Sequence, residues 1–155
     1  MASSTPNIVL LQTFDGRERS IFEKIAAGTI SPGDLIEVDN TGKVAAIASA
    51  GKVSGKLIAL ENPFAPDPTL SALAQNYAAG DTVRYVYAQR GDLINARVAA
   101  SQTVSIGSQL ISTTTGGCLG ATTVDATTLE GALVALAEVA VTTTGSTGRV
   151  QARIV

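Results

Sequence analysis

Short apolar runs, separated by turn residues, follow one another from Pro32 to the end of the chain. The run "LIEV" at 35–38 precedes "DNTG", a sequence typical of hairpin turns because Asn and Gly tolerate positive φ. Side chains alternate between two faces in "TVRYVY" at 82–87 and in the closing "RVQARIV", as in β-strands. The pattern predicts a mainly β fold: a single compact β-barrel or β-sandwich domain with at most one or two short helices, one of them within 70–79.

Four of the apolar runs begin with glycine followed by aspartate or serine: Gly33-Asp34, Gly80-Asp81, Gly91-Asp92 and Gly107-Ser108. Glycine lets the chain reverse without a Cβ clash, and Asp or Ser can bond local backbone amides. The third pair completes an Arg-Gly-Asp tripeptide, a sequence familiar as an adhesion motif on exposed loops. Because the other three pairs have no preceding Arg, we interpret residues 90–92 as the start of a strand and not as a receptor ligand.

The first thirty residues lie outside this pattern. Ser20 and Glu23 have the spacing of a capping box, which predicts a short helix that ends at Gly28. The loose alternation at 21–25 fits an extended arm equally well. We therefore divide the chain into residues 1–30, an N-terminal arm or short helix, and residues 31–155, a β-rich domain.

The segment "LEGALVALAEVAV" at 129–141 leaves helix and strand open. Ala, Leu and Glu favour a helix, whereas apolar residues on both faces are typical of a fully buried strand. The turn residues at 145–148, followed by the alternating "RVQARIV", favour a terminal hairpin of two strands.

Composition limits the classes of partner. The 155 residues are 45% apolar but only 4% aromatic and 15% charged, so Ser, Thr, Gly and Ala cover much of the surface. Such a surface fits a protein packed against other subunits, and it fits a loop-rich β protein as well. A net charge of −2 without a basic patch predicts no nucleic-acid partner and no attraction to an anionic membrane. Without a signal-like start or a long apolar stretch, the chain is expected to be made in a cytoplasm and not to be exported by a classical route.

Catalytic and cofactor chemistry has little support in the residues. Histidine is absent, and the single cysteine, Cys118, allows no intrachain disulfide and no thiolate zinc site. The segment "AGKVSGKL" departs from a phosphate-binding loop at Ala50 and Leu57, and Lys43 lacks the flanking residues of a lipoyl or biotinyl lysine. No two acidic residues form an evident catalytic pair. We expect no enzyme activity, no cofactor and no metal.

Four segments, taken in order, resemble the capsid decoration (cement) proteins of tailed bacteriophages: "EKIAAGTISPGDLIEVDNTGKVAAI", "GKLIALENPF", "YAAGDTVRYVYAQRGDLINARVAASQTVSIGSQLIST" and "GALVALAEVAVTTTGSTGRVQARIV". The resemblance covers roughly residues 24–155, and the middle block is its most specific part. It implies a structural virion protein, made in the host cytoplasm, that binds the outer capsid surface at junctions between major capsid protein subunits. It also implies a homotrimer that stabilises the head against the pressure of packed DNA.

The candidate capsid contacts are the large and charged residues of the arm: Phe14, Arg17, Arg19, Ile21 and Phe22. An arm that orders on binding would enlarge the contact. Two alternatives stay open. One is another phage structural module, from the tail or baseplate, and the other is a small carbohydrate-binding domain that uses Tyr85 and Tyr87 as a platform.

Overall fold

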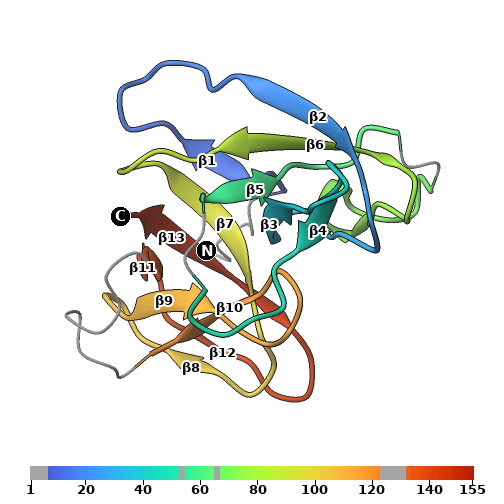
Figure 1. Cartoon of the computed structure of the whole chain (residues 1–155). Helices are drawn as coiled ribbons and strands as arrows, with labels where there is room; N and C mark the ends of the chain where they lie inside the picture. The colour runs from blue at the N-terminus through green and yellow to red at the C-terminus, as the bar shows by residue number, and fades with distance from the viewer. Residues whose placement is uncertain (1–6, 53–54, 65–66, 123–131) are drawn as a thin grey trace.

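The computed structural model describes residues 7–52, 55–64, 67–122 and 132–155, and nearly all of its regular structure is β (Figure 1). The strands are β1 (Leu10–Gln12), β2 (Ile21–Ile25), β3 (Leu35–Val38), β4 (Val44–Ala46), β5 (Leu57–Ala59), β6 (Thr82–Tyr87), β7 (Leu93–Val98), β8 (Thr103–Val104), β9 (Gln109–Ser112), β10 (Leu119–Ala121), β11 (Leu133–Ala137), β12 (Val141–Thr142) and β13 (Gly148–Ile154). Within the described ranges the helical structure is one 3-10 turn, η1 (Ala72–Ala74). The predicted mainly β fold is confirmed, and the helix expected within 70–79 is reduced to this turn.

Five strands close into a barrel in the order β7-β10-β9-β11-β13, because β13 pairs with β7 as well as with β11. On β13, Val150, Ala152 and Ile154 are buried and alternate with partly exposed polar residues, as the sequence pattern predicted. The predicted pairing of the last two long strands is also confirmed, although β12 lies between them in sequence and pairs with β8. Residues 129–131 of the predicted strand segment lie outside the described residues.

A second sheet has the strand order β2-β6-β5-β3-β4. Its β3–β4 hairpin turns at the predicted "DNTG", where an oxygen of Asp39 accepts hydrogen bonds from the backbone of Thr41 and Lys43. Just after β2, Ala26 forms a parallel bridge to Val44 on β4, so the two ends of the sheet come together. The sheet thereby curls around a small core of its own: Ala26, Ile30, Ile36, Val44, Leu57, Ala59, Tyr77, Val83 and Tyr85.

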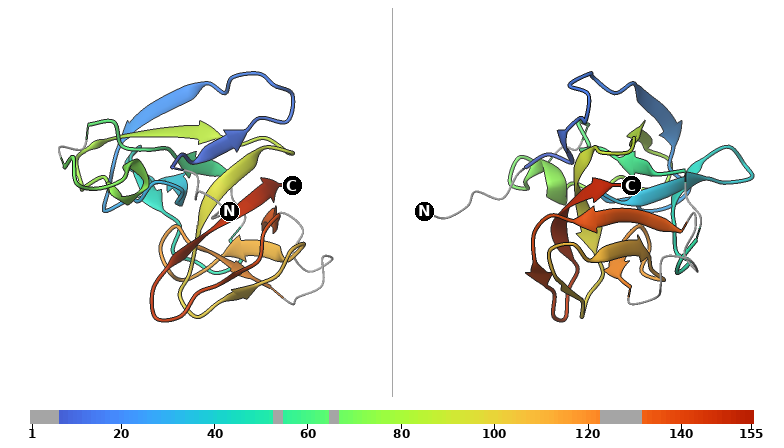
Figure 2. Two further views of the ribbon diagram at one scale, coloured as in Figure 1. Left: turned by 180° about the vertical axis from the view of Figure 1, so that it is seen from behind. Right: turned by 90° about the vertical axis from the view of Figure 1, so that its left-hand side faces the viewer.

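The larger core fills the barrel and continues into the space between the barrel and the second sheet (Figure 2). Leu35, Ile58 and Val86 reach this core from three strands of the second sheet. Their sequence neighbours Ile36 and Tyr85 point to the opposite face and enter the small core. The second sheet is therefore buried on both faces over its central strands, which explains why β5 is apolar throughout.

The first thirty residues supply two strands to this body. Leu10 of β1 pairs with Ile94 on β7, and β2 pairs with β6 along its whole length. The short helix expected to end at Gly28 does not form. Pairing with β6 gives partners to the backbone groups on one edge of residues 21–25 and packs this segment on the sheet, whereas an isolated short helix is marginal and leaves its terminal N–H and C=O groups without partners.

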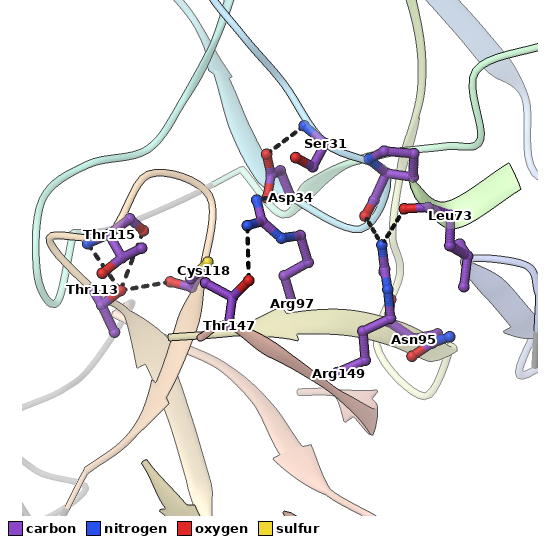
Figure 3. Close-up of polar contacts among 11 residues, drawn as sticks. Ser31, Asp34, Leu73, Asn95, Arg97, Thr113, Thr115, Cys118, Thr147 and Arg149 are labelled. Carbon is purple, nitrogen blue, oxygen red and sulfur yellow. Dashed lines mark hydrogen bonds and ion pairs between the residues drawn. The ribbon is translucent and has the colours of Figure 1, made fainter. Parts of the chain in front are cut away.

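A polar seam joins the second sheet to the barrel (Figure 3). Asp34 is buried just before β3, and its carboxylate accepts a hydrogen bond from Arg97 Nη1 on β7 at 2.7 Å. Arg149 on β13 donates through Nη2 to the carbonyls of Pro32 at 2.9 Å and Leu73 at 2.7 Å. Gly33 completes the seam, since a Cβ there would lie 2.7 Å from both Arg149 Nη1 and the Asn95 carbonyl oxygen.

The seam predicts different costs for the same substitution in two turns. Gly33 and Gly80 have φ values of 86° and 93°, so an alanine in this left-handed region costs about 1–2 kcal/mol at each. Gly33→Ala also forces its Cβ against the seam, which adds roughly 1–3 kcal/mol, whereas Gly80→Ala meets no atom within 4 Å. Urea denaturation should show the larger loss for Gly33→Ala. Equal losses of stability in the two variants would show that the seam side chains can move away from the new Cβ without a cost in free energy.

Candidate functional site

The four Gly-Asp and Gly-Ser pairs form the same turn. The backbone N–H of Asp34, Asp81, Asp92 or Ser108 donates to the carbonyl three residues earlier at 3.0–3.1 Å. In each turn the side chain of that residue accepts from the N–H of the same earlier residue at 2.7–3.0 Å. All four glycines have positive φ, as the third position of a type II turn requires. The common turn interpretation drawn from the sequence is confirmed.

The turn that contains Arg-Gly-Asp differs from the others in what its aspartate binds. The Asp92 side chain is fully buried and accepts hydrogen bonds from Arg19 Nε at 2.8 Å, from Arg19 Nη2 at 2.6 Å and from the Phe14 N–H at 3.0 Å. Arg19 also pairs with Asp15 at 3.0 Å. An adhesion receptor would need this carboxylate exposed, so the adhesion interpretation is excluded in this conformation.

The ion pair between Arg19 and Asp92 joins the β1–β2 loop to the start of β7, and we call it the latch. Each of its two residues shifts the pKa of the other. Burial by itself raises the pKa of Asp92, but Arg19 and the N–H groups of Gln89 and Phe14 outweigh it, so the pKa is lowered overall. The hydrogen bond to Asp92 raises the pKa of Arg19. The pair is therefore ionised at neutral pH and holds the loop closed.

The five predicted contact residues fall into two groups. Arg19 is used inside the molecule and its side chain is only 7% exposed, so its predicted role as a free contact is not supported by its position. Phe14 is 74% exposed and lies over Gly91, where a Cβ would come within 2.6 Å of its ring. Arg17 is exposed in the same loop, and Ile21 and Phe22 are exposed on β2.

An apolar groove of about 520 Å³ runs beside these residues, between the β1–β2 loop and the second sheet. Its apolar walls are Ile8, Leu10, Leu11, Ile21, Leu60 and Val86. Outside the groove, Ile25 and Tyr87 add exposed apolar area on β2 and β6. The sequence interpretation missed Ile8, Leu11 and Ile25, although the "IVLL" run and the alternation at 21–25 were signals for them. We call Phe14, Ile21, Ile25 and the groove the arm face, whereas Phe22 projects from the opposite face of β2 onto Tyr85.

Phe22 packs on two tyrosines of β6. Its ring stacks on Tyr85 with centroids 5.8 Å apart and meets Tyr87 edge-on at 5.2 Å. Tyr85 is only 2% exposed, because its side chain enters the small core. Tyr85 and Tyr87 therefore do not form the open platform that stacking with a sugar ring requires.

The described residues offer little for other chemistry. They contain no group of three or more His, Cys, Asp or Glu side chains placed to hold a metal ion. Cys118 is buried, and burial raises the pKa of its thiol, which disfavours the reactive thiolate. The helical turn η1 is far too short to cross a bilayer, and no other described helix could do so.

Comparison with known proteins finds a similar fold among solved structures. No protein-family model matches the chain, and no curated protein matches it either. Among solved structures, the N-terminal base of the head fiber protein gp8.5 of bacteriophage phi29 is similar, with a TM-score of 0.56 and 12% sequence identity. The match covers 89% of this chain and 95% of that one. The chain therefore shares its fold, over almost its whole length, with that fiber base.

The buried latch predicts a pH-dependent loss in Asp92→Asn. At pH 7 the free energy of unfolding of the variant should be lower than that of the wild type by roughly 1.5–3 kcal/mol, the contribution of a hydrogen bond to a charged group. Because the folded pKa of Asp92 is lowered, its contribution is present above the unfolded pKa of about 3.9 and is lost as pH falls through the lower folded value. Urea denaturation of both proteins should show the difference narrowing below about pH 4.

Asp81→Asn is the matched control, since Asp81 occupies the same position of the same turn and its carboxylate is paired with no arginine of the described residues. At pH 7 Asp81→Asn should lower the free energy of unfolding by less than Asp92→Asn does. A loss for Asp92→Asn that is no larger, or one that does not change with pH, would contradict an ionised latch.

Proposed function

We propose that this chain is a structural protein of a phage virion that binds the outer surface of the head at junctions between major capsid protein subunits and stabilises the shell. One observation carries the proposal: the fold is shared almost end to end with the base of a head fiber. A decoration protein needs a small rigid domain with one face that contacts the shell, and this fold can supply such a domain.

The arm face supports this role physically. Its exposed apolar side chains are Ile21 and Ile25, on the same face of β2, and Phe14 in the β1–β2 loop, and their burial would contribute roughly 25 cal/mol per Å². The Arg19–Asp92 latch fixes the loop before any partner arrives. A preformed surface loses less conformational entropy on binding than an arm that orders at that moment. We therefore replace the ordering arm of the sequence hypothesis with a preformed contact face.

A homotrimer fits the outer edge of β2 better than a two-fold dimer. β2 stands at one end of its sheet, and up to the bridge from Ala26 to Val44 its outer edge has no paired strand among the described residues. A two-fold axis through one of the three central residues of β2, Phe22, Glu23 or Lys24, would pair the strand with a copy of itself over at least three residues. The axis at Glu23 or Lys24 sets like charges opposite each other, and the axis at Phe22 sets Ile21 against Glu23. A three-fold ring instead pairs two different surfaces, which avoids this conflict.

No observation favours a tail or baseplate location over the head. The carbohydrate alternative loses its platform with the burial of Tyr85. That the chain is no enzyme stays a prediction.

Single substitutions on the arm face should weaken binding to heads. Ile21→Ser and Ile25→Ser each remove a branched side chain that is 48% or 42% exposed, so burial of the exposed half contributes about 0.7–1.5 kcal/mol, or roughly three- to tenfold in affinity. The measurement is cosedimentation with undecorated heads, followed by the temperature at which the heads release DNA. Light scattering behind size exclusion should give a trimer for the free or head-released protein.

Ile106→Ser is the control, because Ile106 is 72% exposed in the turn between β8 and β9, away from the arm face. It should bind heads as the wild type does. Loss of binding in the control alone would move the contact to the other end of the molecule. Failure of the wild-type chain to bind heads at all would contradict the proposed function.

A further inference from the structure

Two arginines of the polar seam lie directly opposite each other on neighbouring strands. Arg97 on β7 is the register partner of Arg149 on β13. Like charges at opposed positions of an antiparallel pair destabilise it. After burial, repulsion from Arg97 is the next cause that lowers the pKa of Arg149. The repulsion between the two guanidinium groups lowers the stability of the folded chain unless nearby negative charge offsets it.

Among the described residues, only one of the two arginines has a carboxylate partner. Asp34 binds Arg97 at 2.7 Å. Arg149 donates to the carbonyls of Pro32, Leu73 and Asn95, and no carboxylate of a described residue lies within ion-pair distance of it. Two arginines and the one aspartate in direct contact with them leave a charge of +1, and the charge of Glu61 acts on Arg149 only from beyond ion-pair distance.

Both guanidinium groups line the same open pocket of about 460 Å³. Its remaining walls are Ser31, Leu73, Asn76, Thr147 and Gly148. The hydroxyl of Thr147, an exposed residue just before β13, accepts from Arg97 Nη2 at 3.2 Å (Figure 3). The Nε–H groups of both arginines form no hydrogen bond with another described residue. The pocket thus has positive charge, unused donors and access from solvent.

We propose that the pocket formed by Arg97, Arg149 and Thr147 binds a carboxylate. Guanidinium groups present N–H donors in a fork that matches a carboxylate. One carboxylate brings the local charge from +1 to zero, whereas a phosphate dianion would carry it past zero. The carboxylate has two sources, a small free acid or an Asp or Glu side chain of a neighbouring protein. The inference stands independently of the proposed function.

Acetate is the probe for the isolated chain. In a titration at constant ionic strength, with chloride as the balancing ion, the ¹⁵N–¹H signals of the Arg97 and Arg149 Nε–H groups should shift and saturate. Arg84 and Arg153 serve as internal controls outside the pocket and should show no saturable shift. Absence of saturation at Arg97 and Arg149, or tighter binding of phosphate than of acetate, would overturn the proposal.

A carboxylate built into the rim should fill the site. Thr147→Asp places one beside Arg97, so the variant should melt at a higher temperature than the wild type and lose the saturable acetate shift. Ser146→Asp adds the same charge one residue away, at a position that does not line the pocket, and should keep the acetate response. Retention of wild-type acetate binding by a folded Thr147→Asp variant would contradict the proposed carboxylate site.

Head binding then separates the two sources of the carboxylate. If Thr147→Asp or added acetate weakens cosedimentation with heads, the ligand is an acidic side chain of the shell. If head binding is unchanged while acetate still titrates the pocket, the ligand is a small free acid. If the wild-type chain binds no heads, the proposed function fails, and the acetate titration alone decides the site.

Discussion

The segment Gly33–Leu35 is the point on which both halves of the molecule depend. Its backbone bonds to Ala59 in the second sheet, to Arg97 on the barrel strand β7 and to Gly117 in the loop before β10. The carboxylate of Asp34 adds the ion pair to Arg97 in the same place. Burial raises the pKa of Asp34, and the positive charges of Arg97 and Arg149 act against that rise. A buried charge of this kind contributes mainly by being costly to leave unpaired, so it ties the sheet to one position on the barrel.

Glycine makes this junction possible at two positions. Gly33 passes against Arg149 and the Asn95 carbonyl, and a Cβ at Gly117 would overlap the Asp34 carboxylate. Both glycines have positive φ, so backbone conformation and close approach demand the same residue. The barrel core and the small core of the second sheet can each be filled by ordinary aliphatic side chains because the seam fixes their relative position.

Local signals in the sequence predicted the local structure well. The hairpin at 39–42, the four turns and the alternation of β13 each depend on neighbours in sequence, so their chemistry is visible there. The strand order of the barrel was not predictable, because β7 closes the ring with β13 across about fifty intervening residues. The helix expected near residues 20–28 shows the limit: a capping-box spacing was outweighed by pairing with a strand that comes some sixty residues later.

The candidate site divides in the same way. Phe14, Arg17, Ile21 and Phe22 are exposed, as large or charged residues outside the core pattern would be. Arg19 looked identical in the sequence, but its partner Asp92 lies 73 residues away, so nothing near Arg19 marked it as buried. The opposition of Arg97 and Arg149 was hidden for the same reason, since only the register of β7 and β13 reveals it.

The Arg19–Asp92 latch has a mechanical consequence. It sits in the loop just ahead of β2, and it joins that loop to the start of β7 in the barrel. A force applied to β2 is therefore borne by two sets of contacts, the hydrogen-bond ladder with β6 and the buried ion pair to the residue before β7. A pull along the strand must shear both at once, whereas a ladder alone could be peeled open one rung at a time. A domain built in this way resists detachment most strongly when the force runs parallel to its edge strand.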